Sequence, residues 1–356
     1  MNHQFRGMLP CACVMALALS LTLFPAGETL PEAPPDAAKR YYQQGLKAYQ
    51  QSDYNGAFEA LKKSLDAQPQ SAESLHLLGL VYLNGKKRPT EAIAAFKKAI
   101  EINPKLMQAH VDLAEAYASL GRMGEAEQVL KHALEISPRS TDALLALGKL
   151  YDTDRADDKA IEAYKSVLAD KPDQQEALYY LAQIYDSRRE LRQARELLKQ
   201  LVKINPKHAD AWYALGHIAE RESNFSEATD AYRHAVAAKP DLVDAHYNLS
   251  FIYRAQNAQE EAAKELREVI RLRPEYAEAH MNLGVVMTSL TRFDDAEQAY
   301  QTAVSLKPNM AEAHYNLGVF YELHRKDMFR ALIQYRKYLE LGGKDERVAR
   351  IVRENR

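Results

Sequence analysis

Residues 209–242 decide the fold, and they read ADAWYALGHIAERESNFSEATDAYRHAVAAKPDL. Counted from Ala209 as position 1, the core positions of this unit are 4, 7, 8 and 11 and then 20, 24 and 27. Spacings of three and four residues place these positions on one face of an α-helix, whereas a strand would alternate every second residue. The stretch therefore predicts two amphipathic helices joined by a turn, and Pro240 at position 32 ends the second helix.

This proline recurs at a nearly constant interval. Prolines stand at 69, 104, 138, 172, 206, 240, 274 and 308, which are 34 residues apart except for one interval of 35. A period this strict indicates a repeat protein, in which each unit buries its apolar faces against its neighbours. The ninth unit has Gly342-Gly343 in place of the proline, and this pair also ends a helix. The predicted units are 38–71, 72–106, 107–140, 141–174, 175–208, 209–242, 243–276, 277–310 and 311–345.

Two positions in every unit are restricted to small residues. Position 20 is alanine in all nine units, and position 8 is glycine, alanine or serine. Bulky residues such as Phe96, Tyr164 and Tyr232 fill position 24. Two helices approach closely where both carry small residues, so a larger side chain there would push the pair apart. We therefore expect a packing role for these positions and one continuous core shared by all nine units.

The same positions carry a family resemblance. The tetratricopeptide repeat has a large residue, a Leu-Gly pair, and then an alanine, an aromatic residue, an alanine and a proline, which in this unit are Trp212, Leu215, Gly216, Ala228, Tyr232, Ala235 and Pro240. The chain thus resembles a tetratricopeptide repeat protein over residues 38–345. The resemblance implies an all-α fold, an α-solenoid that forms a right-handed superhelix whose concave wall is lined by the first helices. It also implies a role in binding other proteins, often as extended peptides. A charged helix over residues 346–356 is predicted to cap the last unit.

Two of the units are one residue longer than the others. The second and ninth units contain this extra residue near 84–90 and near 325–329, and we expect it in the turn between their two helices.

The first 27 residues predict a targeting segment. Cys11 to Ala26 form an uncharged run of 16 residues behind a single cation, Arg6, and this run is short for a membrane-spanning helix. A cleaved signal peptide and a retained N-terminal membrane anchor are both consistent with the pattern. Either interpretation places the rest of the chain in a periplasmic or other extracytoplasmic location. Residues 28–37 contain three prolines and predict a short extended linker.

Charge and motif content argue against several functional classes. The chain has 47 Lys and Arg against 49 Asp and Glu, so no overall field attracts nucleic acid. Cys11 and Cys13 are too few and too close for a disulfide framework or a four-ligand zinc site. His246, His280 and His314 share unit position 4, so we expect them in helix packing and not around one metal ion. Because no catalytic motif is found, we predict no catalysis, no cofactor and no small-molecule substrate.

The predicted binding surface lies on the side of the first helices that the core does not use. Position 6 carries asparagine in three successive units, at Asn248, Asn282 and Asn316. An amide both donates and accepts hydrogen bonds, so such a row can hold the backbone of an extended peptide. The row resembles the asparagine ladder in the tetratricopeptide domain of O-linked N-acetylglucosamine transferases. The alternative is that these asparagines are common family residues that face solvent.

Tyrosines and acidic residues extend this predicted surface. Position 5 holds Tyr179, Tyr213, Tyr247 and Tyr315. Their flat rings suit contact with a peptide, although some can instead pack sideways against neighbouring units. Position 12 holds Asp152, Asp186 and Glu220. If these carboxylates line the groove, a basic or hydroxyl-rich segment is the preferred ligand.

Taken together, these patterns predict a non-catalytic scaffold. It would bind an extended peptide or partner protein in an extracytoplasmic cell-envelope assembly, with membrane contact only through a retained N-terminal anchor. A second interpretation is a regulatory adaptor of an envelope enzyme, such as a polysaccharide-synthesis or glycosyltransferase complex. A third is an enzyme with an unrecognised site.

Overall fold

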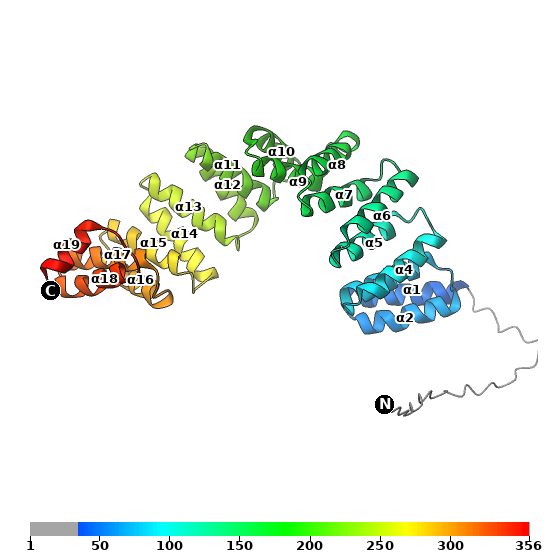
Figure 1. The fold of residues 1–356 in the computed structure, drawn as a ribbon, viewed down its shortest axis with the longest axis horizontal. Helices are drawn as coiled ribbons and strands as arrows, with labels where there is room; N and C mark the ends of the chain where they lie inside the picture. The colour runs from blue at the N-terminus through cyan, green and yellow to red at the C-terminus, as the bar shows by residue number, and fades with distance from the viewer. Residues whose placement is uncertain (1–34, 356) are drawn as a thin grey trace, which may run out of the picture. The chain divides into compact units, whose positions relative to one another are not determined.

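The computed structural model describes residues 35–355, which form nineteen α-helices, α1–α19, and two π-helical turns, η1 and η2, with no β-strand in this range (Figure 1). The predicted all-α class and the repeated helix-turn-helix arrangement are confirmed. The chain divides into two compact units, one that ends at Ile102 and one that starts at Asn103. One core shared by all nine repeats therefore remains a prediction at this boundary.

The N-terminal targeting segment, residues 1–27, lies outside the described residues, as does most of the predicted linker. Among the helices of residues 35–355, none has the length and apolar run needed to cross a membrane.

The first compact unit contains two helix pairs. They are α1 (Pro35–Gln50) with α2 (Tyr54–Ala67), and α3 (Ala72–Leu80) with α4 (Pro89–Ile102). Leu61 and Val81 are fully buried in its core. Because α1 begins at Pro35, the last three residues of the predicted linker are helical and not extended. Proline is tolerated in the first turn of a helix, where the N–H that it lacks has no intrahelical partner.

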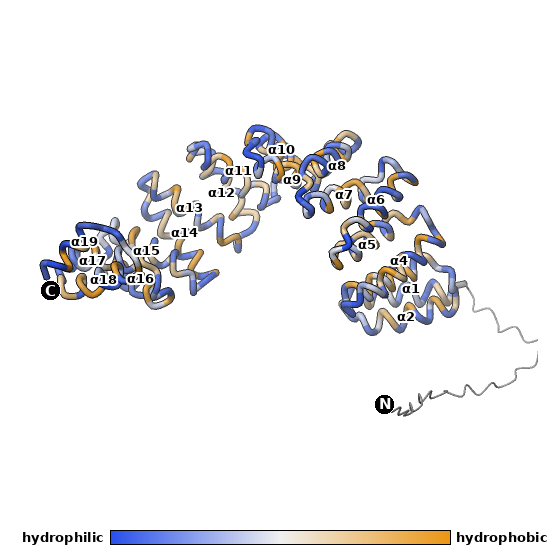
Figure 2. Tube along the Cα trace, viewed as in Figure 1, coloured by the Kyte–Doolittle hydropathy of each residue, from blue (hydrophilic) through white to orange (hydrophobic). Residues whose placement is uncertain are grey.

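The second compact unit continues the pattern through seven helix pairs and a final single helix. Its pairs are α5 (Met107–Ser119) with α6 (Met123–Ile136), α7 (Thr141–Thr153) with α8 (Asp157–Asp170), α9 (Gln175–Ser187) with α10 (Leu191–Ile204), α11 (Ala209–Arg221) with α12 (Phe225–Ala238), α13 (Val243–Ala255) with α14 (Gln259–Leu272), α15 (Ala277–Ser289) with α16 (Phe293–Leu306), and α17 (Ala311–Phe320) with α18 (Met328–Glu340). Each helix packs against the next one along the chain. Each helix carries both hydrophobic and hydrophilic residues along its length (Figure 2), as expected for amphipathic helices.

Within a pair, a small residue at position 8 faces a bulky one at position 24. A Cβ atom added to Gly216 would lie 2.6 Å from the ring of Tyr232, which is closer than real contacts allow. Where position 24 is leucine in the second compact unit, position 8 is instead alanine or serine. These pairs are Ala114 with Leu130, Ala182 with Leu198, and Ser250 with Leu266. The structure thus confirms that position 8 is restricted by packing.

The turn inside each pair uses a residue in the left-handed region. Non-glycine residues with positive φ are Ser52, Lys87, Arg155, Arg189, Ser223, Asn257, Thr291 and Lys326, and Gly121 has the equivalent place in its repeat. In the second and ninth repeats the first helix ends in a π-helical turn, η1 (Val81–Gly85) or η2 (Tyr321–Arg325). The extra residue of these repeats is therefore absorbed at the end of the first helix, before the turn where we expected it.

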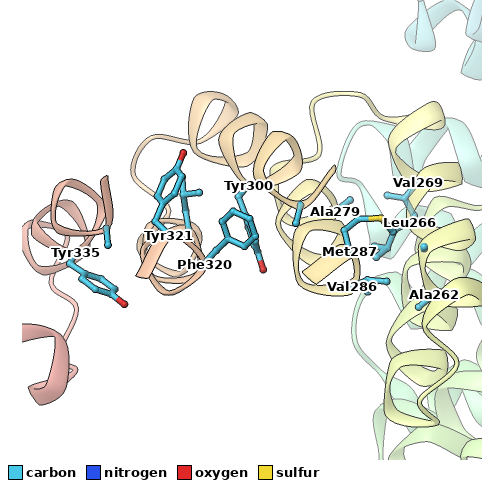
Figure 3. Packing of buried hydrophobic residues seen from close by; sticks show 14 of the residues in the cluster. Ala262, Leu266, Val269, Ala279, Val286, Met287, Tyr300, Phe320, Tyr321 and Tyr335 are labelled. Carbon is cyan, nitrogen blue, oxygen red and sulfur yellow. The ribbon is translucent and has the colours of Figure 1, made fainter. Parts of the chain in front are cut away.

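The C-terminal end of the stack is covered by α19 (Glu346–Glu354), which confirms the predicted capping helix. Val348 is fully buried in a cluster that runs back through α18 to α13, and Figure 3 shows part of this core. The rings of Tyr300 and Phe320 lie 5.6 Å apart in the same cluster (Figure 3). The Asp345 side chain accepts a hydrogen bond from the backbone N–H of Val348 and so fixes the start of α19.

Candidate functional site

The predicted tyrosine and asparagine rows are joined to one another by hydrogen bonds. Asn282 donates from Nδ2 to the hydroxyl of Tyr247, one repeat earlier, at 2.9 Å, and its Oδ1 accepts from Arg254 at 3.0 Å. Asn248 likewise donates to the hydroxyls of Tyr213 at 3.4 Å and of Tyr232 at 3.2 Å. The amides of these two asparagines therefore stabilise contacts between consecutive repeats.

Asn316 differs from the other two asparagines. The residue one repeat earlier at position 5 is Met281, which has no hydroxyl group. Asn316 is half-buried, and its side chain makes no hydrogen bond within residues 35–355. Of the three predicted asparagines, it is the one whose amide hydrogens are not donated to another group within residues 35–355.

The four predicted tyrosines are half-buried, and most of their hydroxyl groups are engaged. Tyr213 and Tyr247 accept the asparagine hydrogen bonds, and Tyr315 donates to Asp345 at 3.4 Å. Tyr179 packs with its ring 5.2 Å from that of His208. Burial raises the pKa of Tyr247 to about 12. The tyrosines are therefore uncharged, and each ring is partly covered by neighbouring residues.

The three predicted acidic residues have different surroundings. Glu220 accepts a hydrogen bond from the hydroxyl of Tyr232 at 2.8 Å, and Asp186 forms an ion pair with Arg221. Asp152 is exposed, and partial desolvation of its carboxylate, followed by the charge of Asp157, raises its pKa. The structure thus shows two of these carboxylates engaged within the chain.

A recess that sequence reasoning missed lies on the surface of the first helices. It has a volume of about 440 Å³ and lies between α5 and α7, with one residue each from α6 and α9. Its apolar lining includes Val111, Ala114, Ala118, Leu145, Ala146 and Leu150. Its polar lining consists of Gln108, Glu115, Asp142, Lys149, Thr153 and Glu176. We call the surface formed by α5, α7, α9, α11, α13, α15 and α17 the first-helix face.

The charges around the recess are predominantly negative. Glu115, Asp142 and Glu176 contribute three carboxylates and Lys149 one cation, a balance of 1 − 3 = −2. The Lys149 ammonium lies 3.5 Å from the Glu176 carboxylate and 5.1 Å from the centre of the Tyr180 ring. The recess therefore combines apolar side chains with an acidic rim.

The signal for this recess in the sequence is the absence of large side chains. Position 5 is tyrosine in five of the nine repeats but is Val111 and Leu145 in two consecutive ones. Ala118 and Ala146 are small at neighbouring positions of the same two helices. Residues that recur from repeat to repeat do not indicate a site that forms where the recurring aromatic residues are missing.

The histidines at position 4 have a shared structural role. Nε2 of His246, His280 and His314 lies 3.2, 2.9 and 3.0 Å from the carbonyl oxygen of the proline six residues earlier. Trp212 donates from Nε1 to the Pro206 carbonyl at 2.9 Å in the same way. Each ring thus connects the start of its helix to the end of the preceding repeat. Within residues 35–355, no group of His, Cys, Asp or Glu is arranged to hold a metal ion.

Comparison with protein families gives matches along most of the chain. Models described as tetratricopeptide repeat match residues 83–150 and 157–218, residues 42–106, and residues 209–242. A model described as TPR repeat matches residues 251–290 and 288–324.

Individual relatives match shorter parts. The photosystem I assembly protein Ycf3 of Prochlorococcus marinus (strain NATL2A) is 34% identical over 89 residues, which is 24% of this chain and 50% of that protein. The chain thus spans about half the length of the curated relatives that it matches.

Two solved structures share the fold. YrrB, described as a TPR protein with an unusual peptide-binding site, aligns over 54% of this chain and 98% of its own with a TM-score of 0.50 and 20% identity. Pseudomonas aeruginosa pilF aligns over 63% and 97% with a TM-score of 0.50 and 20% identity. At these identities, the similarities show the fold alone.

Proposed function

This chain belongs to the tetratricopeptide repeat family, whose fold serves protein interaction, and from this premise we propose that it is a non-catalytic scaffold that binds an extended segment of a partner protein along the first-helix face. YrrB is described as having a peptide-binding site and Ycf3 as an assembly protein, and both descriptions support a protein ligand. The observation that carries the proposal is the recess between α5 and α7.

The chemistry of the recess specifies the kind of segment that fits it. A volume of about 440 Å³ lined by Val111, Leu145 and Leu150 accommodates an apolar side chain. The acidic rim favours basic residues on either side of that side chain. We therefore propose an extended segment in which an apolar residue is flanked by lysine or arginine.

The asparagine row has a narrower role in this proposal than repeat spacing alone predicted. Asn248 and Asn282 use their amide hydrogens on tyrosines within the chain, whereas Asn316 does not. Asn316 is therefore the asparagine that we propose contacts a ligand backbone.

Selection of peptides by the full chain tests the proposal. A displayed library of short random peptides is expected to yield sequences with an apolar residue beside lysine or arginine. Ala146→Phe fills the recess and is expected to weaken these peptides about tenfold or more. Ala94→Phe is the control, because it adds the same ring to an exposed position of α4, outside the first-helix face. Equal binding by both variants would place the peptide site outside the recess.

We also propose that the scaffold works outside the cytoplasm, in a cell-envelope assembly. The uncharged run from Cys11 to Ala26 supports this location. Cell fractionation followed by sequencing of the N-terminus tests it. Recovery of the chain with residues 1–27 intact in the cytoplasmic fraction would contradict the proposal, whereas a processed N-terminus or an intact chain in the membrane fraction would support it.

A further inference from the structure

The last repeat exposes an unusual set of apolar side chains. Phe329 is 75% exposed, Ile333 48%, Leu323 46% and Met328 38%. We call these four residues of η2 and α18 the terminal apolar face. Phe329 and Ile333 are one helical turn apart on the side of α18 opposite the buried Ala331 and Tyr335. Neither of the two therefore belongs to the core.

The other repeats provide an internal comparison for these two residues. Phe329 and Ile333 occupy unit positions 18 and 22, counted so that Ala331 is position 20. In the other eight repeats, the same two positions hold Asn55 and Glu59, Thr90 and Ala94, Gly124 and Gln128, Asp158 and Glu162, Arg192 and Glu196, Ser226 and Asp230, Glu260 and Lys264, and Asp294 and Gln298. None of these residues is aromatic or a large aliphatic. The repeat fold therefore does not require large apolar side chains at these positions.

Free positive charge accompanies the terminal apolar face. Nearby carboxylates are already ion-paired, with Asp327 on Arg330 at 2.7 Å and Glu340 on Lys337 at 3.3 Å. Lys326, in the turn before α18, and Arg336, one turn after Ile333, have no carboxylate partner within residues 35–355. The unneutralised charge beside these apolar side chains is therefore positive.

We propose that the terminal apolar face docks an acidic amphipathic helix of a partner protein. A helix that lies along α18 would cover Phe329 and Ile333 with its apolar stripe. Its flanking carboxylates would pair with Lys326 and Arg336. A second copy of this chain fits less well, because an isologous contact would bring the same unpaired cations of both copies to one interface. This surface lies on a second helix and is separate from the first-helix face.

The test uses the full chain and two fluorescent synthetic helical peptides. Both peptides carry a leucine stripe, one with flanking glutamates and the other with flanking lysines. The glutamate peptide is expected to bind at least about tenfold more tightly. F329D/I333Q gives α18 the residues that α16 has at the same two positions, Asp294 and Gln298. This variant is expected to bind the glutamate peptide about tenfold or more weakly. E260D/K264Q installs the same pair on α14 and is expected to leave binding unchanged.

Further measurements complete this test. K326E/R336E is expected to weaken the glutamate peptide and to reduce the dependence of its affinity on salt. Because Phe329 and Ile333 are exposed, F329D/I333Q should keep the circular dichroism spectrum and melting temperature of the unchanged chain. Equal affinity for both peptides, or unchanged binding by F329D/I333Q, would overturn the proposal. Two other results would also overturn it. One is dimer formation in sedimentation that depends on concentration and is abolished by F329D/I333Q. The other is preferential binding to phosphatidylglycerol vesicles that the same variant abolishes. Peptide selection at the recess uses another surface, so the two proposals fail independently.

Discussion

Two tyrosines at the same repeat position are predicted to affect stability in opposite directions. Tyr164 and Tyr232 both fill position 24 and are fully buried. The Tyr232 hydroxyl donates to Glu220 at 2.8 Å, whereas the Tyr164 hydroxyl is buried with no hydrogen-bond partner in residues 35–355. Asp152 stands where the Tyr232 repeat has Glu220, and its side chain is one methylene shorter. The shorter side chain explains why the Tyr164 hydroxyl lacks an acceptor.

The expected magnitudes follow from these contacts. Burial of an unsatisfied polar group costs about 1–3 kcal/mol, so Tyr164→Phe should raise the free energy of unfolding of its helix pair by about 1 kcal/mol. A hydrogen bond to a charged group contributes about 1.5–3 kcal/mol, so Tyr232→Phe should lower it by about 2 kcal/mol. Asp152→Glu should raise it by about 1 kcal/mol, because the longer side chain reaches the Tyr164 hydroxyl. This gain should disappear when Asp152→Glu is combined with Tyr164→Phe.

Native-state hydrogen exchange with mass spectrometry is the appropriate assay, because long repeat arrays need not unfold in one step. Amides of α7 and α8 report on the Tyr164 variants, and those of α11 and α12 report on Tyr232→Phe. The helices of the other repeats serve as internal controls within each sample. The explanation is refuted if Tyr164→Phe lowers protection in α8 as strongly as Tyr232→Phe lowers it in α12.

Three further measurements examine packing, backbone and charge. Gly148→Ala should lower the free energy of unfolding by about 1–3 kcal/mol through contact with the Tyr164 ring, and Tyr164→Leu in the same chain should recover most of the loss in thermal denaturation, because the Tyr164 hydroxyl has no hydrogen bond to lose. Ser223→Gly should raise that free energy by about 0.5 kcal/mol in urea unfolding, because relief of left-handed strain exceeds the added backbone entropy. Desolvation lowers the pKa of His246, but the hydrogen bond and charge of Glu265 outweigh it, so the net pKa is raised. The stabilising contribution of His246 is therefore full below its usual pKa of about 6.5 and is lost as pH rises through the raised value, and His246→Gln should remove this dependence in urea unfolding measured across that range.

The fold could be predicted because its main constraints are local in the sequence. A helix pair with a ring at position 24 needs a residue without a side chain at position 8, and both positions lie within one 34-residue unit. The small residues of positions 8 and 20 predicted close packing of the two helices, and the structure shows that Gly216 at position 8 lies against the Tyr232 ring. The proline period of the same units located the ends of the second helices.

The contacts between repeats were less predictable. Asn282 and Tyr247 both stood in the predicted binding surface as separate ligand contacts, yet they bond to each other across 35 residues. Whether two side chains of neighbouring repeats meet depends on the rotation between those repeats, which the periodicity of one chain does not specify. The same limit explains why Asp186 appeared free when it in fact forms an ion pair with Arg221 of the next repeat.

Residues that depart from the repeat pattern indicate a binding role more clearly than residues that follow it. Val111 and Leu145 stand on the first-helix face where five other repeats have a tyrosine. In the core of the same region, Gly148 and Tyr164 still pack closely against each other. At Phe329 the chain places a ring where it is 75% exposed and so gains little from burial on folding. Other repeats form the same helix pairs without these features. Packing of the helix pair therefore explains neither the missing tyrosine rings nor the exposed Phe329. We have proposed that contact with another molecule stabilises both surfaces, and substitutions at these positions are therefore expected to change binding before they change stability.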